Sequence, residues 1–210
     1  MSEYKEVDLI LRHVLGVDPS LGGDKSAACL IREIDHVTLR HFQDPLHQRS
    51  YQVIGTKALS GSLVSQSAQI EAIMSRFERC VVGIDITGMG VGIADILESN
   101  HVYPKRITIT GGNHANHNGR KMNVPRTVLI ETLQRVIQQG KIIVLKSQYS
   151  DLLLRELESF RSVYTSDGKL RFEIDISRSL SHADFSFGTA VGVYVLENSG
   201  EVQAVSLAGL

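Results

Sequence analysis

The stretch from His13 to Ile31 constrains the fold of this chain more than any other part of the sequence. It consists of a short apolar run that ends at Asp18, a turn containing Gly22 and Gly23, and a second β-rich run. Two strands joined by a tight turn form an antiparallel pair, so we predict a hairpin with Asp18 at the end of its first strand and Asp24 across the turn. A carboxylate at a strand end is held rigidly yet reaches solvent, which suits a metal ligand. Turn chemistry alone explains the same residues equally well. The choice between a structural turn and a metal site therefore depends on the other carboxylates of the chain.

Length and composition are those of one soluble globular domain. The chain has 210 residues, 42% hydrophobic and 21% charged, which is enough length and an ordinary composition for a sizeable core. No apolar run approaches the roughly 20 residues that cross a membrane, so we expect no membrane partner, and the first residues lack the pattern of a secretory signal. Cys29 and Cys80 lie in apolar runs, which favours buried, reduced thiols of a cytosolic protein and leaves a disulfide open as the alternative. Because the net charge is -1, a site for a polyanion must depend on a local cluster of basic residues.

The N-terminal part of the chain is predicted to form an antiparallel meander. Residues 1–12 mix charged and apolar side chains, and we interpret them as a lead-in helix or a linker remnant before a single domain at 13–210. Residues 37–42 have the pattern of a third strand beside the first hairpin. Residues 43–61 are predicted to be a loop, with a short strand near 51–54.

Helices and strands alternate in the rest of the chain. The run Cys80–Asp85 is almost continuously apolar, as expected of a central strand covered on both faces. Ser166-Asp-Gly168 is a strong hairpin signal between two late strands. Apolar spacing and turn signals predict helices over residues 62–78, 93–98, 125–139, 153–160 and 181–196, and strands over residues 80–85, 106–110, 142–145, 162–165 and 170–174. Three early strands followed by this alternation predict an α/β fold with a mixed sheet.

Two further aspartates join Asp18 as candidates for a site. Asp85 closes the apolar run, where a carboxylate is costly unless it meets solvent, a hydrogen bond or a metal. The glycine-rich segment at 88–92 that follows allows a backbone or ligand to come close, and its spacing differs from that of a dinucleotide-binding fingerprint. Asp184 opens the last predicted helix, where Ser181-x-x-Asp184 also fits a capping box. Taken alone, Asp184 is better explained by capping than by catalysis.

Three separated aspartates suit the hydrolysis of a phosphodiester by two metal ions. Mg²⁺ and Mn²⁺ prefer oxygen ligands, and Mg²⁺ keeps waters and substrate phosphate oxygens in its coordination shell. Two ions about 3.5–4 Å apart need one bridging carboxylate and others on each side. One ion activates the attacking water and the other stabilises the leaving oxygen, so that no covalent nucleophile is required.

Three segments of this chain resemble the nuclease motifs of phage terminase large subunits. In order along the chain, they are Val17-Asp18-Pro-Ser-Leu-Gly-Gly-Asp24-Lys-Ser, Val82-Gly-Ile-Asp85-x-x-Gly-x-Gly and Ser181-His-Ala-Asp184-Phe. Between them, Asn123-Val-Pro-Arg126 at a helix start and Gly140-Lys-Ile before a leucine-rich helix are similar to the intervening region of that family. The resemblance spans roughly residues 13–198, and the order of the three motifs makes it more specific than any one of them.

This resemblance implies an RNase H-like fold of the retroviral integrase superfamily, with a mixed central sheet flanked by helices. It implies a metal-dependent endonuclease that cuts concatemeric double-stranded DNA during viral genome packaging. Asp18, Asp85 and Asp184 match the catalytic, metal-binding triad, with Asp18 bridging two Mg²⁺ or Mn²⁺ ions. Asp24 matches an additional acid that some terminases carry.

The family also implies a set of partners and a location. The partners are the terminase ATPase domain, the small terminase subunit and the portal, in the cytoplasm of an infected bacterium. The chain contains no Gly-x-x-x-x-Gly-Lys-Ser/Thr phosphate-binding loop. We therefore expect the nuclease part alone, without ATPase activity.

Basic side chains near the acids are candidates for DNA contacts, and residues 113–120 are predicted to be a loop at the groove. For each of them a solvated surface charge is at least as good an explanation. The candidates for phosphate contacts are Lys25, Lys105, Arg106, Arg120, Lys121 and Arg126.

Histidines are weaker candidates for metal ligands. His114 and His117 could suggest zinc, but no cysteine or paired ligand motif accompanies them, and a polar loop is the simpler interpretation. His182, two residues before Asp184, is as well suited to approaching the metals as to solvating the helix start.

Three other functions share part of this pattern. A Holliday-junction-resolvase-like nuclease has the same strand-end aspartate and hairpin, but would prefer branched DNA and would carry a Glu where Asp85 stands. An actin/hexokinase-like ATP-binding domain uses a phosphate turn that Gly16-Val-Asp18-x-x-x-Gly22 superficially matches, but usually needs two such domains. A binding module with a vestigial site, for example one that docks on a portal, is the third.

Overall fold

The computed structural model describes residues 5–20, 26–40, 43–164, 170–174 and 183–200. Its main element is an eight-stranded sheet with the strand order β6-β7-β5-β4-β1-β2-β3-β8. The strands of this sheet are β1 (Lys5–Asp18), β2 (Ser26–Arg40), β3 (Gln43–Leu59), β4 (Cys80–Asp85), β5 (Lys105–Thr110), β6 (Asn116–Asn118), β7 (Lys121–Pro125) and β8 (Ile142–Val144). The helices are α1 (Leu63–Met74), α2 (Gly90–Ser99), α3 (Arg126–Gln138), α4 (Ser150–Ser159) and α5 (Asp184–Asn198). A separate two-stranded sheet pairs β9 (Phe160–Tyr164) with β10 (Leu170–Ile174).

The sheet is mixed, and the predicted α/β fold is confirmed. β2 lies antiparallel between β1 and β3. β4 pairs parallel with β1, and β5 and β7 continue in the same direction. At the two edges, β8 is parallel to β3 and β6 is antiparallel to β7. The first three strands are therefore antiparallel and most of the later ones parallel, as expected.

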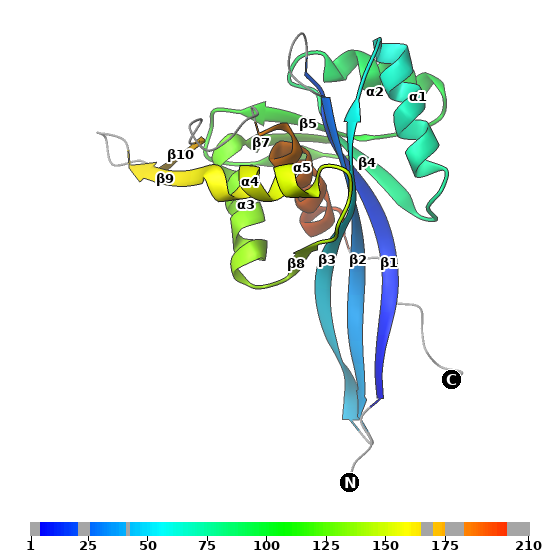
Figure 1. The fold of residues 1–210 in the computed structure, drawn as a ribbon, viewed down its shortest axis with the longest axis vertical. Helices are drawn as coiled ribbons and strands as arrows, with labels where there is room; N and C mark the ends of the chain where they lie inside the picture. Colours follow the sequence, from blue (N-terminus) through cyan, green and yellow to red (C-terminus); the bar gives the residue numbers. More distant parts are fainter. Residues whose placement is uncertain (1–4, 21–25, 41–42, 165–169, 175–182, 201–210) are drawn as a thin grey trace.

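Helices cover both faces of the sheet around β1 and β4 (Figure 1). Successive residues of a strand point to opposite faces. Accordingly Val14 belongs to a core with α3, α4 and α5, whereas Leu15 belongs to a core with α1 and α2. α5 is buried along nearly its whole length and packs on β1 and β2. Because it is enclosed in this way, its sequence is apolar on almost every side.

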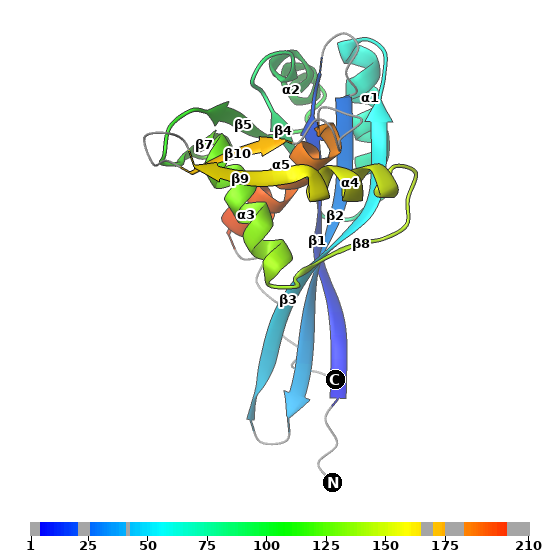
Figure 2. The same ribbon diagram turned by 60° about the vertical axis from the view of Figure 1, so that its left-hand side comes forward.

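β1, β2 and β3 continue beyond the helices as a three-stranded arm (Figure 2). The arm consists of residues 5–12, 32–40 and 43–51. The expected lead-in helix or linker at 1–12 is wrong for residues 5–12, which form the first half of β1 and pair with β2. The division of the chain into a lead-in and one domain remains a prediction.

Two expectations for the arm's other strands are also wrong. Residues 37–40 are the end of β2 rather than a separate third strand. Residues 43–59, expected to be mainly loop, form the 17-residue strand β3. Residues 45–48 are exposed because no helix covers this part of the arm. Without one buried face, a strand lacks the alternation of apolar and polar residues that reveals it in a sequence.

A buried ion pair joins the arm to the helical part of the molecule. Arg12 Nε donates to Glu33 Oε2 at 2.7 Å, with side chains 7% and 1% exposed. Arg12 Nη2 also donates to the carbonyl of Leu196 near the end of α5, at 2.8 Å. The guanidinium thereby fixes the base of the arm against α5.

The other predicted elements are confirmed within the described residues, with shifts of a few residues. The predicted turn at 166–168 and the predicted helix start at 181–182 lie outside the described residues. α3 follows Pro125 and ends before Gly140, which has a φ of 65°. The exception is the expected loop at 113–120, in which residues 116–118 form β6. Cys29 and Cys80 are free thiols, so the alternative of a disulfide between them is not realised. Within the described ranges, each helix is too short or too polar to span a bilayer.

Candidate active site

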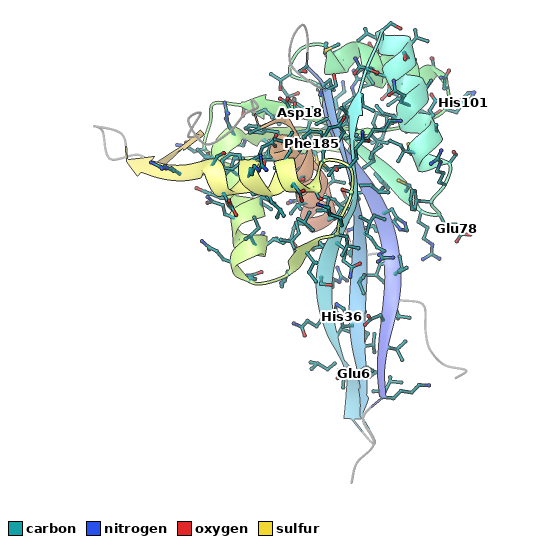
Figure 3. The ribbon with its side chains drawn as sticks, in the orientation of Figure 1. Glu6, Asp18, His36, Glu78, His101 and Phe185 are labelled. Carbon is teal, nitrogen blue, oxygen red and sulfur yellow. The ribbon has the colours of Figure 1, made fainter. Side chains whose placement is uncertain are left out.

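Two of the predicted acids lie at the same edge of the sheet because their strands are parallel neighbours. Val17 of β1 is in register with Ile84 of β4, so Asp18 and Asp85, the next residues, follow at adjacent carboxyl ends. Figure 3 labels Asp18 at this end of β1. In Asp85, Oδ1 accepts from the backbone N–H of Thr87 at 2.7 Å, and this contact fixes the carboxylate at the start of the following turn.

Asp184 reaches this edge on α5, which crosses β1 at very close range. A Cβ on Gly16 would lie 2.0 Å from the carbonyl oxygen of Gly188 and 2.6 Å from the N of Gly192, so only glycine allows this approach. α5 begins at Asp184, after Ala183 with a φ of 67°. A capping box from Ser181 would need the helix to begin earlier, so the capping interpretation does not match this helix start.

The carboxylates are electrostatically coupled. Burial raises the pKa of Asp18 well above its usual range, and the charges of Asp85, Asp184 and Glu156 raise this pKa further, whereas Arg126 lowers it. Burial also raises the pKa of Asp85, while its hydrogen bonds to Thr87 oppose the change. Three acids from β1, β4 and α5 therefore concentrate negative charge at one place.

A pocket of about 240 Å³, here called the acidic pocket, opens at this place. Arg126, at the start of α3, contributes the positive charge in its wall, with its guanidinium carbon 4.7 Å from the ring centre of Phe187. Thr87 Oγ1 accepts from the N–H of Ile109 at 2.8 Å and holds two wall segments together. The lining residues are Asp18, Asp85, Thr87, Ile109, Arg126 and Phe187.

Glu156 of α4 is a site residue that the sequence analysis missed. Its side chain is fully buried, and Oε2 accepts from the N–H of Ser186 in the first turn of α5 at 2.7 Å. It also acts on the pKa of Asp18. The available signal was its position three residues after the buried Leu153, which puts a carboxylate on the apolar face of a helix.

The predicted basic residues separate into different environments. Arg126 lines the acidic pocket, as expected of a residue near a phosphate. Arg106 instead pairs with Asp95 at 2.8 Å and Glu98 at 3.2 Å on α2. Arg120 lies over Tyr103 at 4.6 Å.

Four other residues that were predicted to bind DNA or metal either do not line the acidic pocket or lie outside the described residues. Lys105 is the first residue of β5, the strand whose later residue Ile109 lines the pocket. Asp24, Lys25 and His182 lie outside the described residues, so their predicted roles remain predictions.

The predicted polar loop histidines show no sign of a zinc site. His117 Nε2 lies 2.7 Å from the hydroxyl of Tyr194 on α5, and His114 is exposed. Over the part of the chain that the structure describes, no three His, Cys, Asp or Glu side chains gather tightly enough to enclose a metal ion. Asp18, Asp85 and Asp184 thus share one electrostatic environment without forming a closed ligand cage. Their all-oxygen donor set and excess negative charge fit Mg²⁺ or Mn²⁺ better than zinc.

The raised pKa of Asp18 predicts that this carboxylate destabilises the metal-free protein near neutral pH. A group whose pKa is higher in the folded state keeps its proton on folding, so its stabilising effect is full below the unfolded-state pKa and is lost as the pH rises through the folded-state pKa. Asp18→Asn, measured in EDTA, should therefore have a larger free energy of unfolding than the natural protein at pH 7. This difference should shrink as the pH falls towards 4, in urea titrations at several pH values. A difference that grows on acidification would contradict the assigned environment of Asp18.

The mixed sheet, with its first three strands antiparallel, its helices on both faces and acids at adjacent strand ends, defines the RNase H-like class of folds. Residues 15–187 match the model of the Terminase RNaseH-like domain family, and the chain belongs to this family. No curated protein matched the sequence.

Solved structures of low sequence identity share the fold. The large terminase nuclease from thermophilic phage G20c is 16% identical, with a TM-score of 0.53 over 89% of this chain and 87% of that one. The large terminase nuclease domain of Thermus phage P74-26 is 14% identical, with a TM-score of 0.55 over 92% and 84%. The G20c nuclease has also been solved with bound magnesium, at 15% identity and a TM-score of 0.53 over 89% and 86% of the two chains.

Proposed function

We propose that this domain is a metal-dependent endonuclease that cuts double-stranded DNA as the nuclease part of a viral packaging terminase. The observation that carries the proposal is the coupling of Asp18, Asp85 and Asp184, from three separate elements, beside a pocket with one arginine. Membership of the terminase family and the magnesium bound by the related G20c nuclease support it. By family, the proposed partners are the terminase ATPase domain, the small terminase subunit and the portal, in the cytoplasm of the infected bacterium.

In this proposal Asp18, Asp85 and Asp184 would hold the divalent cations through their carboxylate oxygens. Asp24 and His182 are additional proposed ligands. The bound ions would supply an activated water and would stabilise the leaving oxygen of the cut strand. Two residues of the chain orient the reacting groups. The N–H of Thr87 fixes the rotamer of Asp85, and Arg126 in the pocket wall is available to bind a phosphate oxygen of the DNA.

Glu156 supports the position of α5 in this proposal. Its carboxylate accepts from the N–H of Ser186 in the turn that carries Asp184, and it adds to the negative field at Asp18. A buried carboxylate at a helix N-terminus is stabilised by the N–H groups there. We propose Glu156 as a positioning residue for the site.

The test is cleavage of supercoiled plasmid with Mg²⁺ or Mn²⁺, against the same reaction in EDTA. The proposal expects nicked and linear products that depend on the metal. Faster cutting of a four-way junction than of linear duplex would favour a resolvase-like enzyme instead. ATP turnover without cleavage would favour an actin/hexokinase-like domain, and DNA or portal binding without either activity would indicate a vestigial site.

A further inference from the structure

Arg126 is the one basic residue among those that line the acidic pocket. Its charge acts on Asp18, whose pKa it lowers. A guanidinium beside a carboxylate commonly forms a bidentate ion pair with it. Within the described residues Arg126 forms no ion pair, so another contact must determine where the guanidinium lies.

The ring of Phe187 provides this contact. The guanidinium carbon of Arg126 lies 4.7 Å from the centre of the ring, within the range of a cation–π interaction. Arg126 is exposed at the start of α3. In an exposed setting a cation–π contact and an ion pair stabilise by similar small amounts. The ring can therefore decide which partner the guanidinium takes.

The ring itself has a fixed position. Phe187 is 7% exposed and belongs to the core on the α5 side of the sheet. Phe160, the first residue of β9, meets the ring at 69°, with 6.1 Å between the ring centres, which is an edge-to-face arrangement. The N–H of Phe187 donates to the carbonyl of Ala183 at 2.9 Å. The ring is therefore a rigid support for the flexible side chain of Arg126.

The helix α5 places this support beside one of the proposed metal ligands. Phe187 follows Asp184 by three residues, and residues three apart on a helix lie on the same side. One helix therefore carries both an acid of the site and the support for its arginine.

The position of Arg126 matters because the guanidinium and the metals compete for the same oxygens. An arginine N–H that is bonded to a carboxylate oxygen occupies a lone pair that a divalent cation needs. The same N–H is then lost to a phosphate, which a guanidinium binds best through two parallel hydrogen bonds. A direct ion pair between Arg126 and Asp18 would thus weaken the binding of both cations and DNA.

We propose that Phe187 is a positioning residue, which holds the guanidinium of Arg126 away from the carboxylate of Asp18. Asp18 thereby remains available to divalent cations, and Arg126 remains available to a phosphate oxygen of the DNA. The inference rests on the proposed nuclease function. It adds a residue that keeps the two binding groups apart before metal and DNA arrive.

The first experiment measures the binding of Mn²⁺ without DNA, by electron paramagnetic resonance of the free ion, so that it does not depend on cleavage. Phe187→Leu removes the ring, and the released guanidinium should lower the affinity for Mn²⁺ about tenfold. Phe187→Tyr keeps a ring and should bind like the natural protein. Arg126→Ala should bind Mn²⁺ at least as tightly as the natural protein, because it removes a positive charge near the cations.

The double variant gives the decisive comparison. In the Arg126→Ala background, Phe187→Leu should change the affinity for Mn²⁺ by less than about twofold, since no guanidinium remains to occupy Asp18. A loss of about tenfold in both backgrounds would show that the ring acts only through packing, and would overturn the proposal. Natural affinity in Phe187→Leu would overturn it as well. Should Phe187→Leu not fold, Phe187→Met, with a flexible side chain that fills the space, replaces it with the same expectations.

A second pair of guanidinium and ring provides the matched control. Arg120 lies over Tyr103 at 4.6 Å, and neither residue lines the acidic pocket. Tyr103→Leu should therefore bind Mn²⁺ like the natural protein. A loss equal to that of Phe187→Leu would contradict an effect that is specific to the pocket.

DNA binding in EDTA tests the other half of the proposal. In a plot of log affinity against log salt concentration, Arg126→Ala should reduce the magnitude of the slope by about 0.9. Phe187→Leu should reduce it by the same amount, and the double variant should reduce it no further. The slope of the natural protein in Phe187→Leu would show that Arg126 reaches the phosphate without the ring, and would overturn the proposal.

Plasmid cleavage distinguishes failure of this inference from failure of the proposed nuclease. Metal-dependent cutting by the natural protein, together with additive effects of the two substitutions on Mn²⁺ binding, overturns the inference alone. Coupled effects on Mn²⁺ binding without any cutting overturn the nuclease alone and leave Phe187 as the residue that separates Arg126 from Asp18.

Discussion

Asp85→Asn is expected to lower the rate of metal-dependent DNA cleavage by more than about 100-fold. Loss of a group that only supports a metal ligand already costs 10–100-fold, and Asp85 is proposed as a ligand itself. The exchange keeps the side-chain volume and the oxygen that accepts from the N–H of Thr87 at 2.7 Å, so the local fold should persist. The measurement is the initial rate of plasmid nicking at saturating Mg²⁺ or Mn²⁺.

A surface aspartate provides the matched control for this loss. Asp151 is 65% exposed and pairs with Lys146 on the surface, so Asp151→Asn should cut at the natural rate. Both variants should retain the circular dichroism spectrum of the natural protein. Cleavage by Asp85→Asn at more than a tenth of the natural rate would remove Asp85 from the metal site.

Gly16→Ala is expected to prevent normal packing of α5 and to abolish cooperative folding. Its Cβ would lie 2.0 Å from a carbonyl oxygen and 2.6 Å from a backbone nitrogen of α5. These are backbone atoms, so the whole helix must move, and even ordinary overpacking costs about 1–3 kcal/mol. Because α5 carries Asp184, the displacement should also end cleavage. Thermal unfolding followed by circular dichroism measures the first effect.

Gly55→Ala tests whether the effect at Gly16 is specific to that position. Gly55 is also a strand residue, but the nearest atom to its added Cβ, on Leu30, is 3.8 Å away. This is an ordinary contact, so the free energy of unfolding should change by less than about 1 kcal/mol. A Gly16→Ala protein as stable as Gly55→Ala would contradict the close crossing of β1 and α5.

The sequence predicted the structure best for elements that are buried in the core, because their side chains are apolar. The run Cys80–Asp85 is apolar because β4 lies in the middle of the sheet between β1 and β5. The end of this apolar run predicted that Asp85 lies at the end of a strand. The family motifs predicted that Asp18 and Asp184 would lie nearby, and parallel pairing of β1 with β4 gives the physical reason for Asp18.

Other features depend on contacts that no local pattern encodes. β3 was expected to be a loop because its first residues have two solvent-facing sides in the arm, and pairing with β2 alone makes them a strand. Glu156 was missed because only the packing of α4 on α5 brings it to Ser186 and into the field of Asp18.

If Asp18, Asp85 and Asp184 together hold divalent cations, a crystal soaked in Mn²⁺ should contain manganese at these carboxylates. Anomalous diffraction locates manganese independently of the protein atoms. We expect two peaks about 3.5–4 Å apart, with carboxylate oxygens of Asp18 within coordination distance of both and those of Asp85 and Asp184 on one ion each. No peak at the acidic pocket at millimolar Mn²⁺, or peaks coordinated elsewhere, would contradict it.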